Sequence, residues 1–151
     1  MRRSQRIDVY RHTLERTREE RAARVQEIQQ RLVLARQRLC ELQAYRQEYA
    51  SALPQRIAQG LGAVALLDYQ SFMARLQLAI EAQQELVQRT EQEEGFGVQR
   101  LREVAVQHQA VSAVIERWQQ EERAGEQRRE QRVSDERAQR PSALNLLREA
   151  S

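Results

Sequence analysis

The chain has 151 residues, of which 31% are charged and 5% aromatic, and its formal net charge is +3. Its mean hydropathy of −0.82 is too low for a thick globular core. The single Cys40 cannot form an intramolecular disulfide, and neither a signal peptide nor a run of roughly 20 apolar residues is present. We therefore expect a cytoplasmic protein in a reducing compartment, with no direct membrane insertion.

The first part of the chain repeats an apolar residue at alternating steps of three and four. The residues of this apolar seam are Val25, Ile28, Leu32, Ala35, Leu39, Leu42, Tyr49 and Leu53, and only Arg46 interrupts the spacing. Such steps average to the coiled-coil period of about 3.5 residues. The spacing therefore predicts a first long helix over residues 1–53.

A chain reversal is predicted over residues 54–65, because Pro54 cannot donate a hydrogen bond inside a helix and Gly60 and Gly62 favour turns. The seam then resumes at Tyr69, Met73, Leu76, Ile80, Val87, Leu101, Val104, His108, Val111, Ile115 and Trp118. This spacing predicts a return helix over residues 66–118. The predicted fold is all-α, a long two-helix antiparallel coiled-coil hairpin.

Residues 119–151 are rich in Glu, Gln and Arg, and include Gly125 and Pro141. In the register that places Ile7 near Ile115, this segment has no partner helix in the same chain. We therefore expect a charged C-terminal arm that is partly frayed or disordered.

Gly95 and Gly97 lie inside the return helix, where each costs about 1 kcal/mol relative to Ala. The seam keeps its spacing across both glycines. We therefore expect a soft or bent point in this helix and not a domain boundary.

No catalytic, cofactor-binding or metal-binding residues are predicted. His12 and His108 are far apart in the sequence, and His108 occupies a seam position, where a histidine is more often a spacer than a base or a ligand. Neither Cys40 nor any serine lies in a nucleophile motif. The Gly60–Gly62 turn lacks the strand, the lysine and the spacing of a phosphate-binding loop. We therefore expect no enzymatic activity.

Arginines outnumber carboxylates near the amino terminus, whereas the rest of the chain interleaves Arg with Glu. Interleaved charges are typical of a solvated helix surface, and a net charge of +3 is small for a protein that binds nucleic acid. We expect no nucleic acid partner. The alternative is a basic end that meets an acidic protein or a nucleic acid.

Apolar residues also lie beside the seam on both sides of the predicted reversal. The flanking heptad positions there are Tyr45, Ala52, Phe72, Ala79 and Leu86. In an antiparallel pair these flanks face the same side. Two helices cannot bury such a strip by themselves, so we expect a groove or ridge for a partner protein. Alternatively, Tyr45 and Phe72 thicken the core near the turn.

One set of residues around the reversal is more specific than the heptad spacing. Its members are Leu42, Tyr45, Glu48, Tyr49, Tyr69, Gln70, Phe72, Leu76, Ala79 and Ile80. With the Pro- and Gly-containing reversal between them and the Gln-rich arm, these residues resemble the FliJ family, small cytosolic components of the bacterial flagellar type III export apparatus. The resemblance implies a non-enzymatic coiled coil similar to the central stalk of rotary ATPases. It also implies partners: the hexameric export ATPase FliI with its regulator FliH, the export gate protein FlhA, and export chaperones.

The resemblance further implies two binding regions and a location. The export-gate patch corresponds to Leu42, Tyr45, Tyr49, Phe72, Leu76 and Ala79. By the stalk analogy the end with both termini enters the ATPase ring, and its candidate contacts are Arg6, Arg11, Arg18, Arg123, Arg128, Arg129 and Arg132. The implied location is the cytoplasm, with peripheral association to the inner membrane through the export apparatus. An injectisome stalk of the same architecture and a scaffolding or nucleic-acid-associated coiled coil are the alternatives.

Overall fold

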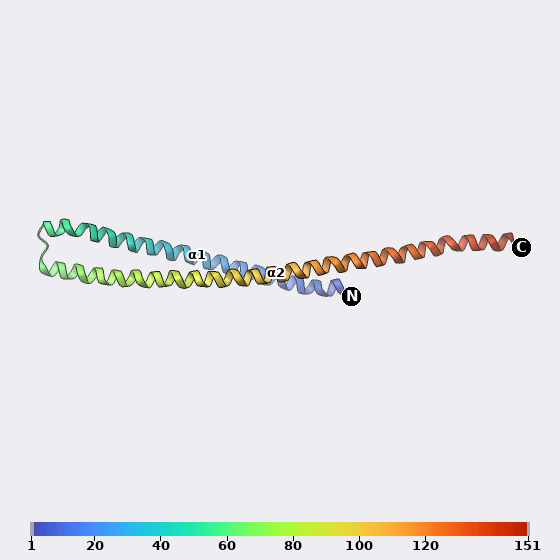
Figure 1. Cartoon of the computed structure of the whole chain (residues 1–151), viewed down its shortest axis with the longest axis horizontal. Helices are drawn as coiled ribbons and strands as arrows, with labels where there is room; N and C mark the ends of the chain where they lie inside the picture. Colours follow the sequence, from blue (N-terminus) through green and yellow to red (C-terminus); the bar gives the residue numbers. More distant parts are fainter. Residues whose placement is uncertain (1, 151) are drawn as a thin grey trace. The chain divides into compact units, whose positions relative to one another are not determined.

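The protein is described by a computed structural model that covers residues 2–150, without the side chains of residues 141–145. It consists of two long helices, α1 (Arg3–Ala58) and α2 (Ala63–Glu149), joined by a short turn (Figure 1). The described residues contain no strand. The helices pack against each other in opposite directions, which confirms the predicted all-α helical hairpin. Neither described helix contains an apolar stretch that could cross a membrane.

The turn is shorter than the sequence indicated. α1 continues past Leu53 to Ala58 and contains Pro54. Pro54 removes one helical donor, but it is exposed, so water can satisfy the freed carbonyl. The reversal itself depends on Gly60, whose φ of 93° lies in the left-handed region that favours glycine. The Gly60 backbone N–H donates to the Ile57 carbonyl at 3.1 Å and closes the end of α1.

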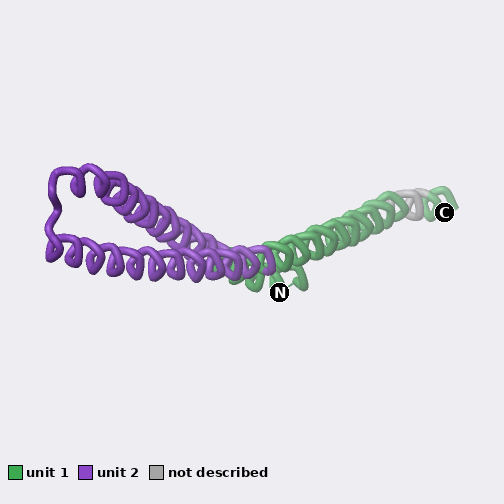
Figure 2. The backbone as a smooth tube through the Cα atoms, turned by 60° about the vertical axis from the view of Figure 1, so that its left-hand side comes forward, with its two compact units in different colours: residues 1–17, 104–151 green, residues 18–103 purple. Residues whose placement is uncertain are grey.

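The chain divides into two compact units, residues 18–103 and residues 1–17 with 104–151 (Figure 2). Each unit contains a stretch of both helices. The first unit includes the turn, and the second includes the amino-terminal part of α1 and the carboxyl-terminal part of α2.

The core of the 18–103 unit follows the predicted seam. Its buried residues are Val25, Ile28, Leu32 and Ala35 from α1, and Leu76, Ile80, Val87 and Thr90 from α2. Leu32, Ala35 and Val87 form one cluster against which Leu39 packs. Thr90 donates its hydroxyl to the Leu86 carbonyl at 2.8 Å, so this polar seam residue is satisfied within α2.

Gly97 has a packing role that sequence reasoning missed. A Cβ atom at Gly97 would lie 3.3 Å from Val25 Cγ2 and 3.6 Å from Ile28 Cδ1, whereas a Cβ at Gly95 meets nothing within 4 Å. α2 is helical through both positions. Gly97 therefore lets the two helices approach closely. At Gly95, by contrast, packing between the helices does not require a glycine.

Burial decreases toward the turn. Leu39, Leu42, Leu53 and Met73 occupy seam positions but are only half-buried. Within this unit the two helices spread apart as they approach the turn (Figure 1). Side chains that would meet across a closely packed pair are therefore left partly open to solvent.

The second unit has a smaller apolar core, formed by Leu14, Val104 and Ile115. Pairing between the helices extends beyond Trp118, where we expected it to stop. Ser4 is buried and its hydroxyl donates to Glu122 Oε2 at 2.7 Å. This contact is within about one helical turn of the predicted register.

α2 also continues as a helix through the segment expected to fray. Glu, Gln and Arg are good helix formers, and the Nε–H groups of Arg123, Arg128 and Arg129 donate to carbonyls four residues earlier. Since Arg2 forms an ion pair with Glu126, residues after about 127 extend past the start of α1. Fraying of this extension in solution stays a prediction.

Candidate functional site

Three aromatic rings meet where the helices spread. Tyr45 and Tyr49 lie four residues apart on α1, and Phe72 lies opposite them on α2. The ring centroids are 4.9 Å apart for Tyr45 and Tyr49, 4.9 Å for Tyr49 and Phe72, and 6.1 Å for Tyr45 and Phe72. These are favourable distances for tilted and edge-to-face aromatic pairs. The cluster therefore connects the two helices where they spread apart.

Hydrogen bonds fix the orientation of the cluster. The Tyr45 hydroxyl donates to the Tyr49 hydroxyl at 3.3 Å, and this bond is the main reason that the pKa of Tyr45 is raised. The Tyr69 hydroxyl donates to the Tyr49 backbone carbonyl at 3.2 Å. Tyr45 and Tyr49 are thus held by neighbours, and the aromatic surface is ordered before any partner arrives.

A groove lies beside these rings. We call it the tip groove. The residues that line it are Arg38, Glu41, Leu42, Tyr45, Phe72, Arg75 and Leu76. Arg38 forms an ion pair with Glu41 at 3.5 Å, whereas Arg75 has no ion pair among the described residues. The groove therefore combines an apolar floor with a cationic rim, an arrangement that suits an amphipathic helix.

The structure brings most of the predicted gate patch together. Leu42, Tyr45, Phe72 and Leu76 line the tip groove, and Tyr49 joins it through ring contacts. Ala79 is exposed but does not line the groove. Leu76 is buried, Phe72 is half-buried and Tyr45 is 43% exposed. Partner binding at this patch stays a prediction.

The charged rim was missed by sequence reasoning. Arg38 lies four residues before Leu42, and Arg75 lies three residues after Phe72. Residues three or four apart share a helix face, so this spacing was available in the sequence. These two arginines did not stand out, because arginines are frequent along the whole chain.

A second recess connects the aromatic cluster to the turn. It is lined by Tyr49, Arg56, Leu61, Ala65, Asp68, Tyr69 and Phe72. The Arg56 guanidinium lies 5.5 Å from the centre of the Tyr49 ring, within the range of a cation–π contact. The surface around Phe72 is therefore continuous with residues of the turn.

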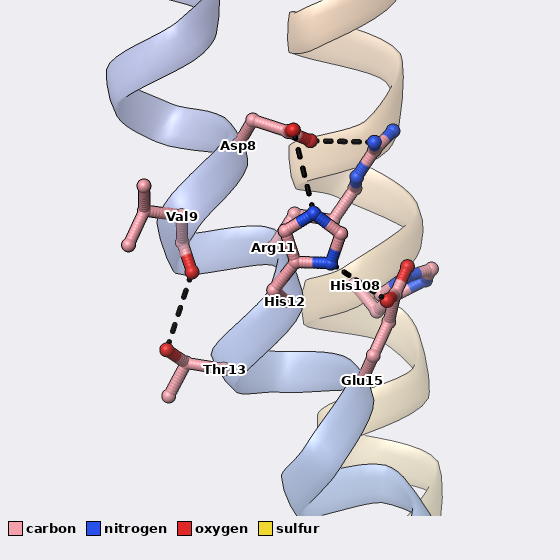
Figure 3. Close-up of polar contacts among 7 residues, drawn as sticks. All are labelled: Asp8, Val9, Arg11, His12, Thr13, Glu15 and His108. Carbon is pink, nitrogen blue, oxygen red and sulfur yellow. Dashed lines mark hydrogen bonds and ion pairs between the residues drawn. The ribbon is translucent and has the colours of Figure 1, made fainter.

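Polar residues cluster in the second unit, at the position of the seam histidine (Figure 3). His108 Nε2 lies 3.1 Å from Glu15 Oε1, and His12 Nδ1 lies 3.2 Å from Glu15 Oε2. The two histidines, distant in sequence, thus share one carboxylate. Hydrogen bonds from His108 and then from His12 lower the pKa of Glu15. The described residues contain no group of three or more His, Cys, Asp or Glu placed to hold a metal ion.

The start of α1 is held by carboxylates of α2. Besides the Ser4 hydroxyl bond, the Ser4 backbone N–H donates to Glu122 Oε1 at 3.3 Å. The hydroxyl bond is the main cause that lowers the pKa of Glu122. Arg3 forms an ion pair with Glu121 at 2.6 Å, and its guanidinium lies 4.2 Å from the centre of the Trp118 ring. The Ser4 backbone contact satisfies one of the N–H donors that a helix amino terminus leaves free, and the side-chain contacts link the start of α1 to α2.

The arginines proposed for ATPase contact differ in their exposure and in whether their side chains already have a partner. Arg11 is half-buried and its guanidinium lies 2.5 Å from Asp8 Oδ1, so Arg11 is the weakest candidate of the set. The other members are exposed, and Arg18 belongs to the 18–103 unit rather than to the unit that contains the rest. Arg6, Arg18 and Arg132 have no side-chain partner among the described residues.

Comparison with protein families gives one match. A family model described as Flagellar FliJ protein matches residues 9–145, which is nearly the whole chain. No curated protein matches the chain, and no solved structure matches it.

Proposed function

Because the chain belongs to the flagellar FliJ protein family, we propose that it is a stalk-like export component that binds and stimulates the hexameric export ATPase and contacts the export gate. Membership makes it a coiled-coil accessory protein of flagellar export. The finer proposal names the ATPase FliI with its regulator FliH, the gate protein FlhA, and escorted export chaperones as partners. It also places the protein in the cytoplasm, peripherally at the inner membrane through these partners, with no enzymatic activity of its own.

The aromatic cluster at the tip groove is the observation that carries the gate contact. Tyr45 is 43% exposed although its ring contacts both Tyr49 and Phe72. Aromatic side chains that are ordered and partly exposed dominate protein interfaces when a partner buries them. The unpaired Arg75 at the rim supplies a donor for a carboxylate of the partner.

The opposite role, ATPase binding, is assigned to the unit with both termini. Support comes from its exposed arginines, among them Arg6, Arg123, Arg128 and Arg132. The extension of α2 past the start of α1 offers a helix face that no α1 residue covers. Electrostatic attraction to an acidic surface of the ATPase speeds association and depends on salt concentration.

A pair of variants tests this division of roles. Phe72→Ala removes an interface anchor, which can cost on the order of 2 kcal/mol or more of binding. It should weaken binding to the gate protein and reduce motility, while ATPase stimulation is retained. Leu78→Ala is the matched control, because Leu78 is also on α2, is exposed, and lies outside the groove.

Deletion of residues 127–151 is the complementary variant. It keeps the contacts of Glu121, Glu122 and Glu126 with the start of α1, so the helix pair should stay folded by circular dichroism. ATPase stimulation should fall while gate binding persists. If Phe72→Ala abolishes ATPase stimulation as fully as the deletion does, the division of roles is wrong.

A further inference from the structure

The residues around the turn form the longest uncharged part of the hairpin end. No charged residue occurs between Arg56 and Asp68, in a chain of which 31% is charged. Five large aliphatic residues lie in this stretch. Leu66 is half-buried, and the other four are Ile57, Leu61, Val64 and Leu67. We call these four residues the aliphatic tip.

The aliphatic tip is open to solvent. Val64 is 75% exposed and Leu67 is 65% exposed, Ile57 is also exposed, and Leu61 is half-buried. Within this unit the backbones of the two helices are spread apart near the turn (Figure 1). Exposed aliphatic residues gathered without a neighbouring charge mark interaction sites more often than solvated surface.

The backbone holds the aliphatic tip in one arrangement. The Gln59 N–H donates to the Gln55 carbonyl at 3.1 Å, and the Leu66 N–H donates to the Gly62 carbonyl at 3.0 Å. Ile57 lies in α1, and Val64 and Leu67 lie in α2. Three of the four side chains therefore project from helical backbone, and little ordering entropy is lost when they are buried.

The aliphatic tip is continuous with the tip groove. Phe72 lines both the groove and the second recess, and the second recess also contains Leu61. One partner that covers the aromatic cluster can thus reach the turn along a recess in which the two charged lining residues have opposite signs. Arg56 and Asp68, which border this path, carry opposite charges and add no net charge.

We propose that the aliphatic tip is a second anchor that docks into an uncharged, apolar socket of the same partner protein that binds the tip groove. This inference rests on the proposed function, in which that partner is the export gate protein. The groove then provides aromatic and guanidinium contacts, and the aliphatic tip provides a separate purely apolar contact.

The composition of the tip favours a protein socket over a lipid surface. Membrane-surface segments combine apolar residues with an excess of Lys or Arg and with interfacial aromatic residues. The stretch between Arg56 and Asp68 contains no basic and no aromatic residue. A phospholipid surface thus has no charge to attract it.

The size of the tip also argues against a second copy of the chain. A stable interface buries about 800 Å² on each partner, and two sets of four aliphatic side chains meeting end to end supply far less. A concave socket surrounds the same side chains more completely, so it gains more from them.

The test compares two double variants that introduce the same charges. Val64→Asp with Leu67→Asp places two carboxylates on the tip. Val33→Asp with Leu34→Asp places them on an α1 surface of similar exposure, 61% and 65%, away from the turn. We expect the tip variant to bind the cytoplasmic part of the gate protein at least about tenfold more weakly than wild type. The Val33 and Leu34 control should bind within about threefold of wild type.

A second tip variant tests whether charge repulsion alone explains weaker binding of the gate protein. Val64→Ser with Leu67→Ser shortens the side chains without adding charge, and it should also weaken gate binding. Circular dichroism should show unchanged helicity and melting for all these variants, because every substituted residue is exposed. If both tip variants bind the gate as tightly as wild type does, the inference is wrong.

Three further outcomes are distinguishable. If Phe72→Ala weakens gate binding and the tip variants do not, the proposed function stands and the aliphatic tip has no part in it. If wild type does not bind the gate at all, the proposed function fails and this inference fails with it. If wild type floats with phosphatidylglycerol vesicles, or forms dimers by light scattering, and the tip variants do neither, the occupant is a membrane or a second copy, which also overturns the inference.

Discussion

Within the 18–103 unit, the same heptad spacing gives a closed core in one region and an open apolar surface in the other. Leu32, which is 2% exposed, packs with Ala35 and Val87, and the missing side chain of Gly97 lets α2 approach Val25 and Ile28. Around Tyr45 and Phe72 the helices spread and the seam is only half-buried. The difference indicates that heptad spacing does not by itself decide where the two helices close on each other and where they leave apolar surface that a partner can bind.

The largest expected effect separates the two regions by stability. Leu32→Ala should lower the free energy of unfolding by about 2–5 kcal/mol, because it leaves a cavity among Ala35, Val87 and Leu39. Tyr45→Ala should cost much less, since the Tyr45 side chain is largely exposed. Thermal melts followed by circular dichroism measure both changes.

The neighbouring Val33 provides the control for Leu32→Ala. Val33 is exposed on the same helix, and Val33→Ala should change the free energy of unfolding by less than about 0.5 kcal/mol. Should Tyr45→Ala destabilise the protein as much as Leu32→Ala does, the tip rings belong to the core and the comparison fails.

The next effect concerns the part of α2 that extends past α1. Residues 127–140 are all exposed, so their amides should exchange with solvent far faster than amides near Ile80 or Val87. Hydrogen exchange followed by mass spectrometry measures this difference. Equal protection in both segments would show that the extension is stabilised by something other than pairing.

A smaller effect tests whether close approach of the two helices requires a glycine at Gly97 but not at Gly95. Replacing a glycine inside a helix by alanine gains up to about 1 kcal/mol when the new methyl group has room. Gly95→Ala should therefore stabilise the protein. Gly97→Ala should gain less or destabilise it, because the new Cβ lies 3.3 Å from Val25 Cγ2. Equal gains in melting temperature would mean that Gly97 has no role in packing.

Much of this architecture could be predicted from the sequence because heptad spacing specifies which helix face is covered. The antiparallel register followed from placing Leu53 opposite Tyr69 across the reversal, and Ser4 lies within about one turn of its expected partner. How closely the two helices pack at each point could not be predicted in the same way. It depends on local volumes, such as the absent Cβ of Gly97 and the rings of Tyr45 and Tyr49.

The candidate site shows the same limit. Its aromatic members could be recognised by residue type and flanking position. The importance of the rim residue Arg75 and of the aliphatic tip could not be predicted, because it depends on how exposed their side chains are. Pro54 was read as a helix end, yet a solvated position tolerates the missing hydrogen bond.

The smallest expected effect contrasts the apolar seam of the 18–103 unit with the polar contacts of the other unit. The pKa of Glu122 is lowered in the folded protein, mainly by the Ser4 hydroxyl. A carboxyl group with a lowered folded pKa adds stability above its ordinary value of 4.5, and this stability is lost as the pH falls through the folded pKa. The melting temperature should therefore fall as the pH drops below about 4.5.

Trp118 makes this prediction specific to one unit. It is the only tryptophan of the chain, and it lies under the Arg3 guanidinium at the start of α1. Its fluorescence should therefore change in acid before the far-ultraviolet circular dichroism does. Glu122→Gln should reduce this acid sensitivity, whereas Glu116→Gln, an exposed change on the same helix, should not. If Trp118 fluorescence and circular dichroism change together in every variant, the two units unfold as one and the polar contacts give no separate pH response.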